Sequence, residues 1–263
     1  MNNKQVVLVV SFGTSHNETR VKTIEAIEKA IGGAYPDCEV RRAFTSPTII
    51  KKLAKRDGLI IDDVTEALKH LTADGVKRVI VQPTYVITGF EYDNMIEMTK
   101  PFEAKFDKIS HGLPLLSSDK DYEDVAEVLM NETAAYANGD TAIVFMGHGS
   151  KHNANAAYGR LDKLFKDRVC ANYFVGTVEA EPTIEELLLG VKAVGAKKVV
   201  LFPLMVVAGD HAVNDMAGDD ESSWKNIFES NGYETECVLR GLGEYKGIQD
   251  IFVSHIGKAE EKL

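Results

Sequence analysis

The chain has 263 residues, of which 44% are hydrophobic and 27% charged, and its formal net charge is −10. A chain of this length and composition can bury one large α/β core or two smaller ones, which excludes a disordered protein. The acidic balance argues against broad electrostatic binding to nucleic acid or to an anionic membrane, because both require a basic surface. We therefore expect a small-molecule partner, with no nucleic acid and no membrane.

Short β-branched runs alternate with amphipathic segments along the chain. Residues 6–10 form an apolar run that is too short for a signal-peptide core or a membrane span, so we interpret it as a strand of a cytoplasmic protein. Ser15 and Glu18 form a candidate capping box before a helix, and Thr183 and Glu186 form another. Further strands are expected at 79–81, 142–145, 173–178 and 199–202. This alternation predicts parallel sheets covered by helices.

An internal repeat is the most informative feature of the sequence. An offset of 120 positions places residues 75–83 on residues 195–203, and it also places Gly89 on Gly209 and Asn94 on Asn214. Residues 9–15 similarly resemble residues 144–150 at an offset of 135. The repeat predicts two similar α/β domains, 1–138 and 139–263, each a parallel sheet flanked by helices. A linker-like turn at 136–140 marks the boundary, and a cleft is expected between the domains.

Three side chains that can bind a metal each follow an expected strand of the second half: His148, Glu179 and His211. Because the carboxyl ends of parallel strands share one edge of a sheet, we expect the three to converge. Two imidazoles and one carboxylate suit a divalent ion such as Co, Ni, Fe or Zn. In the repeat, Glu91 falls on His211 and Gly13 falls on His148. The first half therefore keeps one carboxylate, which we expect to guide the ion or to accept a proton.

Two turns at expected helix starts are candidates for binding the acidic groups of a substrate, because free backbone N–H groups there attract anions. Together with aromatic contacts, the candidates are Ser11, Phe12, Gly13, Thr14, Ser15, Phe90, Gly149 and Ser150. Candidate cations nearby are Arg41, Arg42 and Lys51.

The remaining histidines and the cysteines show no pattern typical of a site. We expect structural roles for His16, His70, His111, His152 and His255. The cysteines are scattered without a C-x-x-C pair, so we expect buried thiols at Cys38, Cys170 and Cys237. The sequence has no phosphate loop for nucleotide hydrolysis and no G-x-S-x-G elbow of a serine hydrolase.

These residues resemble a known family, the anaerobic sirohydrochlorin cobaltochelatases of the class II chelatase group, which also contains ferrochelatase. The resemblance is carried by segments 8–15, 42–46, 112–118, 145–149, 178–179, 203–211, 214–216, 219–220 and 223–225. It implies a tetrapyrrole bound in the cleft and Co²⁺, as the substrate metal, held by His148, Glu179 and His211. His148 would also be the catalytic base, and Glu91 would be an acidic residue of the same cleft.

The expected function is thus a lyase of the metal chelatase type: ATP-independent insertion of Co²⁺ into sirohydrochlorin, or precorrin-2, in anaerobic cobalamin biosynthesis. The resemblance implies no organic cofactor and leaves open a homo-oligomer. Alternatives are insertion of iron or nickel into the same class of ring, a non-catalytic carrier of tetrapyrrole or metal, and a sugar- or amino-acid-binding protein. Thr88-Gly-Phe precedes Glu91 where the family carries a more polar run, which bears on the metal preference.

Overall fold

Residues 5–168 and 172–261 are described by the structure, which is a computed structural model. The chain forms two units, one of Met1–Ser117 with Ile248–Leu263 and one of Ser118–Gly247. Each unit contains a four-stranded sheet in which all neighbouring strands are parallel. Among the helices of the described ranges, none has both the length and the apolar character needed to cross a membrane.

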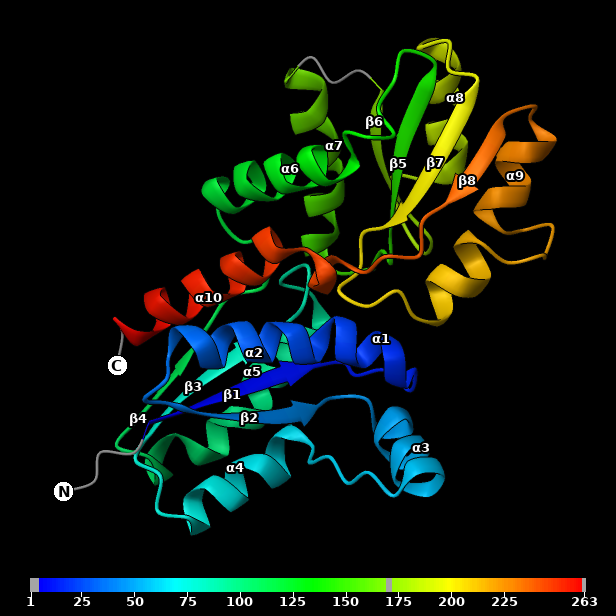
Figure 1. Ribbon diagram of the computed structural model, residues 1–263. Helices are drawn as coiled ribbons and strands as arrows, with labels where there is room; N and C mark the ends of the chain where they lie inside the picture. The colour runs from blue at the N-terminus through cyan, green and yellow to red at the C-terminus, as the bar shows by residue number, and fades with distance from the viewer. Residues whose placement is uncertain (1–4, 169–171, 262–263) are drawn as a thin grey trace. The chain divides into compact units, whose positions relative to one another are not determined.

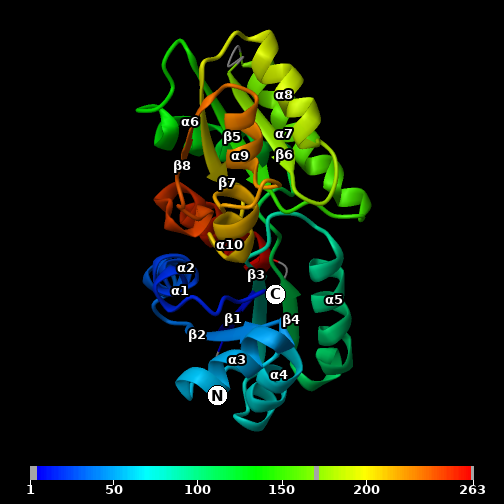
Figure 2. The ribbon, with the colours of Figure 1, turned by 90° about the vertical axis from the view of Figure 1, so that its right-hand side faces the viewer.

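The sheet of the first unit has the strand order β2-β1-β3-β4. Its strands are β1 (Gln5–Ser11), β2 (Glu39–Phe44), β3 (Arg78–Pro83) and β4 (Lys108–His111). Its helices are α1 (Asn17–Lys22), α2 (Ile24–Ala34), α3 (Pro47–Asp57), α4 (Val64–Ala73), α5 (Phe90–Thr99), a 3₁₀ helix (Lys100–Lys105) and most of α10 (Lys246–Glu260). Helices α1 and α2 lie on one face of this sheet, and α5 lies on the other (Figure 2).

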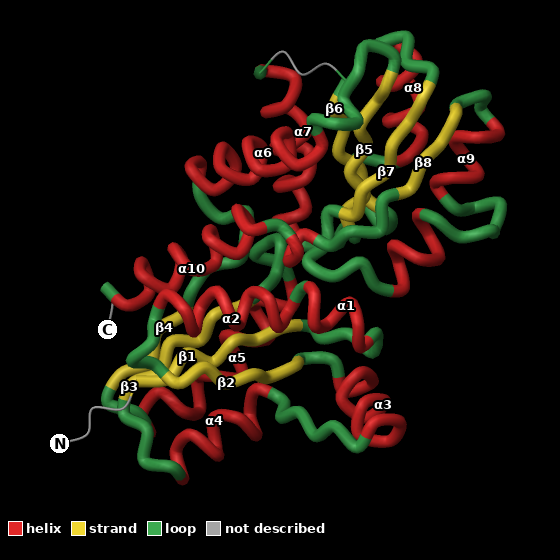
Figure 3. Tube along the Cα trace, viewed as in Figure 1, coloured by secondary structure: helices red, strands yellow, loops and turns green. Residues whose placement is uncertain are grey.

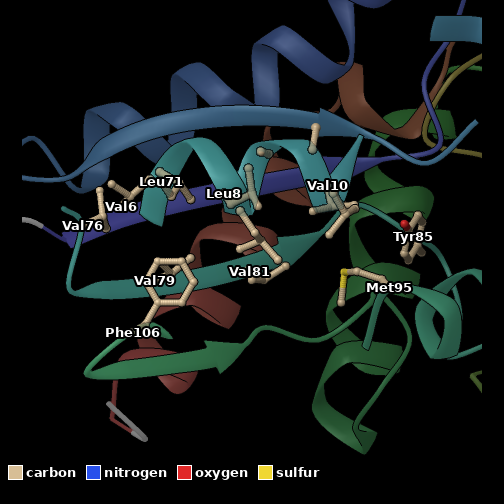
Figure 4. Packing of buried hydrophobic residues seen from close by; sticks show 14 residues of the cluster. Val6, Leu8, Val10, Leu71, Val76, Val79, Val81, Tyr85, Met95 and Phe106 are labelled. Atoms are coloured by element: carbon tan, nitrogen blue, oxygen red, sulfur yellow. The ribbon is translucent and has the colours of Figure 1, made fainter. Parts of the chain in front are cut away.

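Alternation along the strands explains how this sheet is covered. Val6, Leu8 and Val10 of β1 are fully buried and belong to one cluster with residues of α4 and α5, among them Leu71 and Met95 (Figure 4). The intervening residues of β1 are equally buried and face the opposite side, because successive side chains of a strand alternate. A strand buried on both faces explains why residues 6–10 read as one continuous apolar run.

The sheet of the second unit has the strand order β6-β5-β7-β8. Its strands are β5 (Thr141–Gly147), β6 (Tyr173–Thr177), β7 (Lys198–Pro203) and β8 (Glu234–Cys237). Its helices are α6 (Asp119–Thr133), α7 (Ala156–Asp167), α8 (Ile184–Ala193), α9 (Trp224–Ser230), a π-helix (Ala212–Met216) and 3₁₀ helices at Asn153–Asn155 and Leu242–Glu244. Figures 1 and 3 show helices on both faces of this sheet.

Aromatic packing fills one face of the second sheet. Phe145 of β5 stacks on Phe165 of α7 at 5.8 Å between ring centroids and contacts Phe202 of β7 at 5.7 Å. The other face buries Val144 and Met146 in a cluster that includes residues of α8 and α9. The central strands are thus fixed from both sides, which gives their carboxyl ends a rigid support.

The two sheets confirm the repeat, because their strand orders correspond one to one. Gly75 and Gly195, paired at the offset of 120, have nearly equal positive φ angles of 70° and 69°. The offset of 135 for the first strands was wrong. Thr84 donates to the carbonyl of Val10, and Leu204, its partner at the offset of 120, donates to the carbonyl of Met146. Val10 therefore corresponds to Met146, an offset of 136.

The corrected offset changes which residues correspond in the two halves. Gly13 corresponds to Gly149, and both have positive φ, 97° and 86°. Phe12, and not Gly13, is then the equivalent of His148. The turn glycine is the physical marker of the register here, because only glycine adopts such angles without strain.

The division into units differs from the expected domains 1–138 and 139–263. Helix α6 belongs to the second unit, where the hydroxyl groups of Thr133 and Tyr173 lie 3.0 Å apart in a hydrogen bond. Most of α10 belongs to the first unit, where His255 Nδ1 bonds the carbonyl of Leu113. The expected linker at 136–140 is therefore a turn inside the second unit.

All five expected strands are present, and the two expected capping boxes had different outcomes. The Thr183 hydroxyl accepts from the N–H of Glu186, whose carboxylate accepts from the N–H of Thr183, as predicted. The Ser15 box was wrong, because His16 is the N-cap of α1 and makes no side-chain cap bond. The Ser15 side chain is buried instead.

Two of the cysteines are less buried than expected. Cys38 and Cys237 are free thiols with partial exposure. Cys170 lies outside the described residues.

Candidate metal site

His148, Glu179 and His211 each lie just beyond a strand of the second sheet. His148 follows β5, Glu179 follows β6, and His211 lies in the turn after β7. In the order β6-β5-β7-β8, the chain goes from β5 to β6 on one side of β5, and then crosses to β7 on the other side. The direction of the strand order therefore reverses between β5 and β7. Ligands of open α/β sheets bind at the carboxyl ends of strands at such a reversal.

The structure brings these three side chains together. One ligand atom from each lies within 4.8 Å of the other two. His148 Nδ1 is 3.8 Å from Glu179 Oε2, and the two imidazoles meet edge to face with centroids 4.5 Å apart. Atoms that share a divalent ion at about 2.1 Å lie about 3 to 4 Å apart, so small side-chain rotations complete such a site. The expected convergence is confirmed, and the binding of a metal stays a prediction.

The three side chains are accessible to an incoming ion. Their exposed fractions are 45% for His148, 55% for Glu179 and 38% for His211. A partly open set of two imidazoles and one carboxylate leaves room for a further ligand, as in metal sites where chemistry occurs.

Backbone hydrogen bonds beyond the strand ends fix the loops that carry His148 and Glu179. The N–H of Glu179 donates to the carbonyl of His148 at 3.0 Å, and the N–H of Val178 donates to the carbonyl of Gly147 at 3.0 Å. The β5–β6 pairing therefore continues into both loops and sets the spacing of the two side chains.

Gly149 is required where the His148 loop passes the end of β6. Its φ is +86°, and a Cβ at this position would lie 2.9 Å from the backbone nitrogen of Ala180 and 2.9 Å from the Thr177 side chain. Any other residue at position 149 would force the His148 loop away from β6.

Both histidines use Nδ1 for a hydrogen bond within the protein. His148 Nδ1 lies 2.9 Å from the carbonyl of Gly149, and His211 Nδ1 lies 2.6 Å from Asp215 Oδ2. On His211 this leaves Nε2 for a metal. On His148 the same Nδ1 also lies 3.8 Å from Glu179, so no single nitrogen is assigned to the metal on this ring. Asp215 was not among the expected site residues, although it lies four residues after His211 in the sequence.

A cavity of about 410 Å³ lies beside Glu179. Its lining includes Glu181 and Glu185. Hydrogen bonds from the backbone N–H of Glu185 and from the hydroxyl of Thr183 lower the pKa of Glu185, so this carboxylate is ionised at neutral pH. The approach to Glu179 on this side is therefore acidic and favourable to cations.

The first unit does not duplicate the three-residue set. The N–H of Ser46 donates to the carbonyl of Phe12, just as the N–H of Glu179 donates to the carbonyl of His148. Phe12 therefore corresponds to His148, and Ser46 corresponds to Glu179. Glu91, matched to His211, accepts a hydrogen bond of 3.1 Å from the Thr45 hydroxyl. Of the three equivalents only Glu91 has a side chain that readily binds metals. Its expected position facing His148 stays a prediction.

The predicted substrate-binding residues of the first unit divide into engaged hydroxyls and exposed rings. The Ser11 hydroxyl lies 2.8 Å from that of Thr84, and the Thr14 hydroxyl accepts from the N–H of His16. Phe12 and Phe90 are 51% and 54% exposed, so their rings are available to a ligand.

The second turn repeats this arrangement. The Ser150 hydroxyl accepts from the N–H of His152 at 3.1 Å, as Thr14 does from His16. Gly149, tight against β6, leaves only its backbone for contact with a ligand. The assignment of these residues to a substrate stays a prediction.

Two of the three candidate cations, Arg41 and Arg42, are paired within the first unit, and the third, Lys51, is an exposed residue. Arg41 forms ion pairs with Glu39 and Asp74, and Arg42 pairs with Glu28. Their charges are largely neutralised, which weakens their assignment to a substrate.

The histidines expected to be structural have local partners. His70 Nδ1 bonds Asp62 at 2.7 Å, and His111 Nε2 bonds the Thr99 hydroxyl at 2.8 Å. Burial also lowers the pKa of His111. These contacts agree with structural roles outside the metal-capable set.

Known proteins resemble this chain over nearly its whole length. The family model described as cobalt chelatase (CbiK) matches residues 5–261. The sirohydrochlorin cobaltochelatase of Salmonella typhimurium is 41% identical over 257 residues, covering 97% of this chain and 96% of the relative. Sirohydrochlorin cobaltochelatase CbiKC of Nitratidesulfovibrio vulgaris is 34% identical over 262 residues, covering 99% of this chain and 92% of the relative.

Solved structures share the fold at low sequence identity. SirB from Bacillus subtilis, solved with Fe³⁺, has a TM-score of 0.68 at 12% identity and covers 97% of this chain and 95% of its own. CbiX, described as the terminal enzyme of siroheme biosynthesis in denitrifying bacteria, has a TM-score of 0.57 at 15% identity and covers 97% and 99%. These likenesses establish a chelatase-like fold. With a family match across both units, the chain belongs to the cobalt chelatase (CbiK) family.

Proposed function

We propose that this chain inserts Co²⁺ into sirohydrochlorin without ATP, and that His148, Glu179 and His211 present the metal. The observation that carries the proposal is the convergence of two imidazoles and one carboxylate within 4.8 Å at the carboxyl edge of the second sheet. Both full-length relatives are named sirohydrochlorin cobaltochelatases, which supports this substrate and this metal.

The chemistry of the donor set suits a metal that must be handed on. Imidazole and carboxylate bind Co²⁺ with moderate strength, whereas thiolates would retain a soft ion more firmly. Transfer from three side chains to the ring nitrogens needs no ATP because the macrocycle is the stronger chelator. Co²⁺ is therefore a substrate here, not a resident cofactor.

Proton removal is the second requirement of insertion, since two pyrrole N–H protons leave as the ring nitrogens bind Co²⁺. We assign one proton to His148. As Co²⁺ moves to the ring, the His148 nitrogen that held it is released and becomes free to accept that proton. The 45% exposure of this side chain allows it to pass the proton to water. Glu91 stays the candidate acceptor for the second proton, or a residue that guides the ion.

An absorption assay with sirohydrochlorin and Co²⁺ tests the proposal. The enzyme is expected to convert many equivalents of sirohydrochlorin, and adding ATP should not change the rate. A carrier would give a spectral change that stops at one equivalent, which would contradict catalysis.

Because the donor set also accepts Fe²⁺ and Ni²⁺, the rates with the three ions are compared at equal free concentration. A rate with Fe²⁺ or Ni²⁺ far above that with Co²⁺ would reassign the metal.

Variants of the histidines connect the activity to the site. His148→Ala and His211→Ala are each expected to lose most of the insertion activity while the fold is retained, because both side chains are partly exposed. His70→Ala is the matched control, since His70 is an exposed histidine of the first unit whose ring bonds Asp62. Full turnover by both site variants would reject the assignment.

A further inference from the structure

The side chain of Asp215 makes the shortest hydrogen bond to the candidate metal site. Its Oδ2 lies 2.6 Å from Nδ1 of His211, four residues earlier in the chain. A carboxylate can only accept, so Nδ1 carries the proton and donates it. Nε2 is then unprotonated and has its lone pair free on the opposite side of the ring.

We propose that Asp215 is a positioning residue, which fixes the tautomer and the ring orientation of His211 so that Nε2 faces the metal. This inference rests on the proposed function of His148, Glu179 and His211. Metal-binding histidines commonly donate their second ring nitrogen to a carboxylate, and such an acceptor raises the basicity of the metal-binding nitrogen.

The π-helix explains why Asp215 is held in place. Two of its residues, Ala212 and Met216, are fully buried and belong to the core cluster of the second sheet. The N–H of Ala217 bonds the carbonyl of Ala212, which closes the wide turn. Because these anchors point into the core, His211 and Asp215 remain together on the outer, partly exposed side.

Gly218 adds a second restraint at the end of the π-helix. A Cβ on Gly218 would lie 2.2 Å from the carbonyl oxygen of Asn214, so the chain can close this tightly only with glycine. The position of Asp215 therefore depends on the backbone on both sides of it.

The two histidines of the site are held by different kinds of acceptor. Nδ1 of His148 bonds a backbone carbonyl, that of Gly149, whereas Nδ1 of His211 bonds a charged side chain. A charged acceptor makes the stronger hydrogen bond. His211 is thus the firmer ligand, and His148 is the one that is released more readily when the metal leaves.

The test compares full-length Asp215→Ala and Asp215→Asn with the parent chain. Asp219→Asn is the matched control, because it removes the same charge from an exposed residue four positions further on. Co²⁺ affinity is measured by titration, with the visible absorption band of bound Co²⁺ as the signal. Steady-state kinetics give kcat and the KM for sirohydrochlorin.

Asp215→Ala is expected to weaken Co²⁺ binding by about 10- to 100-fold and to alter the absorption band, because His211 is no longer oriented. Asp215→Asn keeps an acceptor oxygen and should recover part of this loss. The KM for sirohydrochlorin should stay unchanged in both variants, and Asp219→Asn should match the parent chain throughout.

Two results would overturn the proposal, and His211→Ala distinguishes them. If Asp215→Ala binds Co²⁺ as the parent chain does while His211→Ala loses binding, Asp215 has no positioning role and the metal site stands. If His211→Ala also retains the affinity and spectrum of the parent chain, the metal site itself is wrong.

Discussion

Replacing Gly149 with alanine tests how the backbone fixes the candidate site. The φ of +86° costs an L-residue about 1 to 2 kcal/mol. The new Cβ also lies 2.9 Å from the backbone nitrogen of Ala180, which cannot move as a side chain would. Overpacking of this kind costs about 1 to 3 kcal/mol more. We therefore expect Gly149→Ala to lower the free energy of unfolding by about 2 to 5 kcal/mol.

Gly195→Ala is the matched control for this prediction. Gly195 has a φ of +69°, also in the second unit, and a Cβ there would meet no atom within 4 Å. Only the backbone cost of about 1 to 2 kcal/mol remains. Urea unfolding of both variants thus separates the free-energy cost of the backbone angle from the cost of the steric collision.

Cobalt titration of the same two variants gives the functional consequence. Gly149→Ala should also weaken Co²⁺ binding, because relief of the collision moves the loop that carries His148, whereas Gly195→Ala should not. Equal stability and equal Co²⁺ affinity of the two variants would show that a side chain at position 149 neither collides with Ala180 nor displaces the His148 loop.

Three further predictions concern helix capping, pH and thiol reactivity. Thr183→Ala removes a capping-box bond and should cost about 1 kcal/mol in urea unfolding, and an unchanged midpoint would contradict the assigned cap. Burial lowers the pKa of His111 from its usual value of 6.5. As the pH falls, the unfolded chain therefore binds a proton at His111 before the folded chain does. Stability should therefore fall as the pH drops below about 6.5, and His111→Gln should lose that part of the dependence in urea unfolding at several pH values. Burial raises the pKa of Cys237 to about 11, so its alkylation at pH 8, followed by mass spectrometry, should be much slower than in the unfolded chain. Equal rates would count against this shift.

The four central strands and the buried edge strand β6 could be predicted from the sequence, and the other three edge strands could not. Strands β1, β3, β5, β6 and β7 are largely buried and have apolar runs. Strands β2 and β8 contain charged residues at partly exposed edges, and β4 has only four residues. A pattern of hydrophobic residues detects burial, so it does not detect strands that are only half covered.

The convergence of His148, Glu179 and His211 could be predicted from parallel topology, because the segments that follow neighbouring parallel strands leave the sheet at the same edge. The hydrogen bond between Asp215 and His211 could not, because a spacing of four residues is common and the π-helix of five residues that brings the two together has no hydrophobic period of its own. The partners of α6 and α10 were missed for a related reason. An amphipathic helix shows that it has a buried face, but not which sheet covers that face.

The return of α10 to the first unit has a consequence for the order of folding during synthesis. The second unit is continuous in the chain, Ser118–Gly247, so all of its residues are synthesised before Ile251, Phe252 and Ile256 of α10. The first unit begins earlier, yet it lacks the buried side chains of Ile251, Phe252 and Ile256 until α10 is translated. The unit that begins first is therefore completed after the second unit, and the apolar surface that α10 buries stays uncovered in the interval.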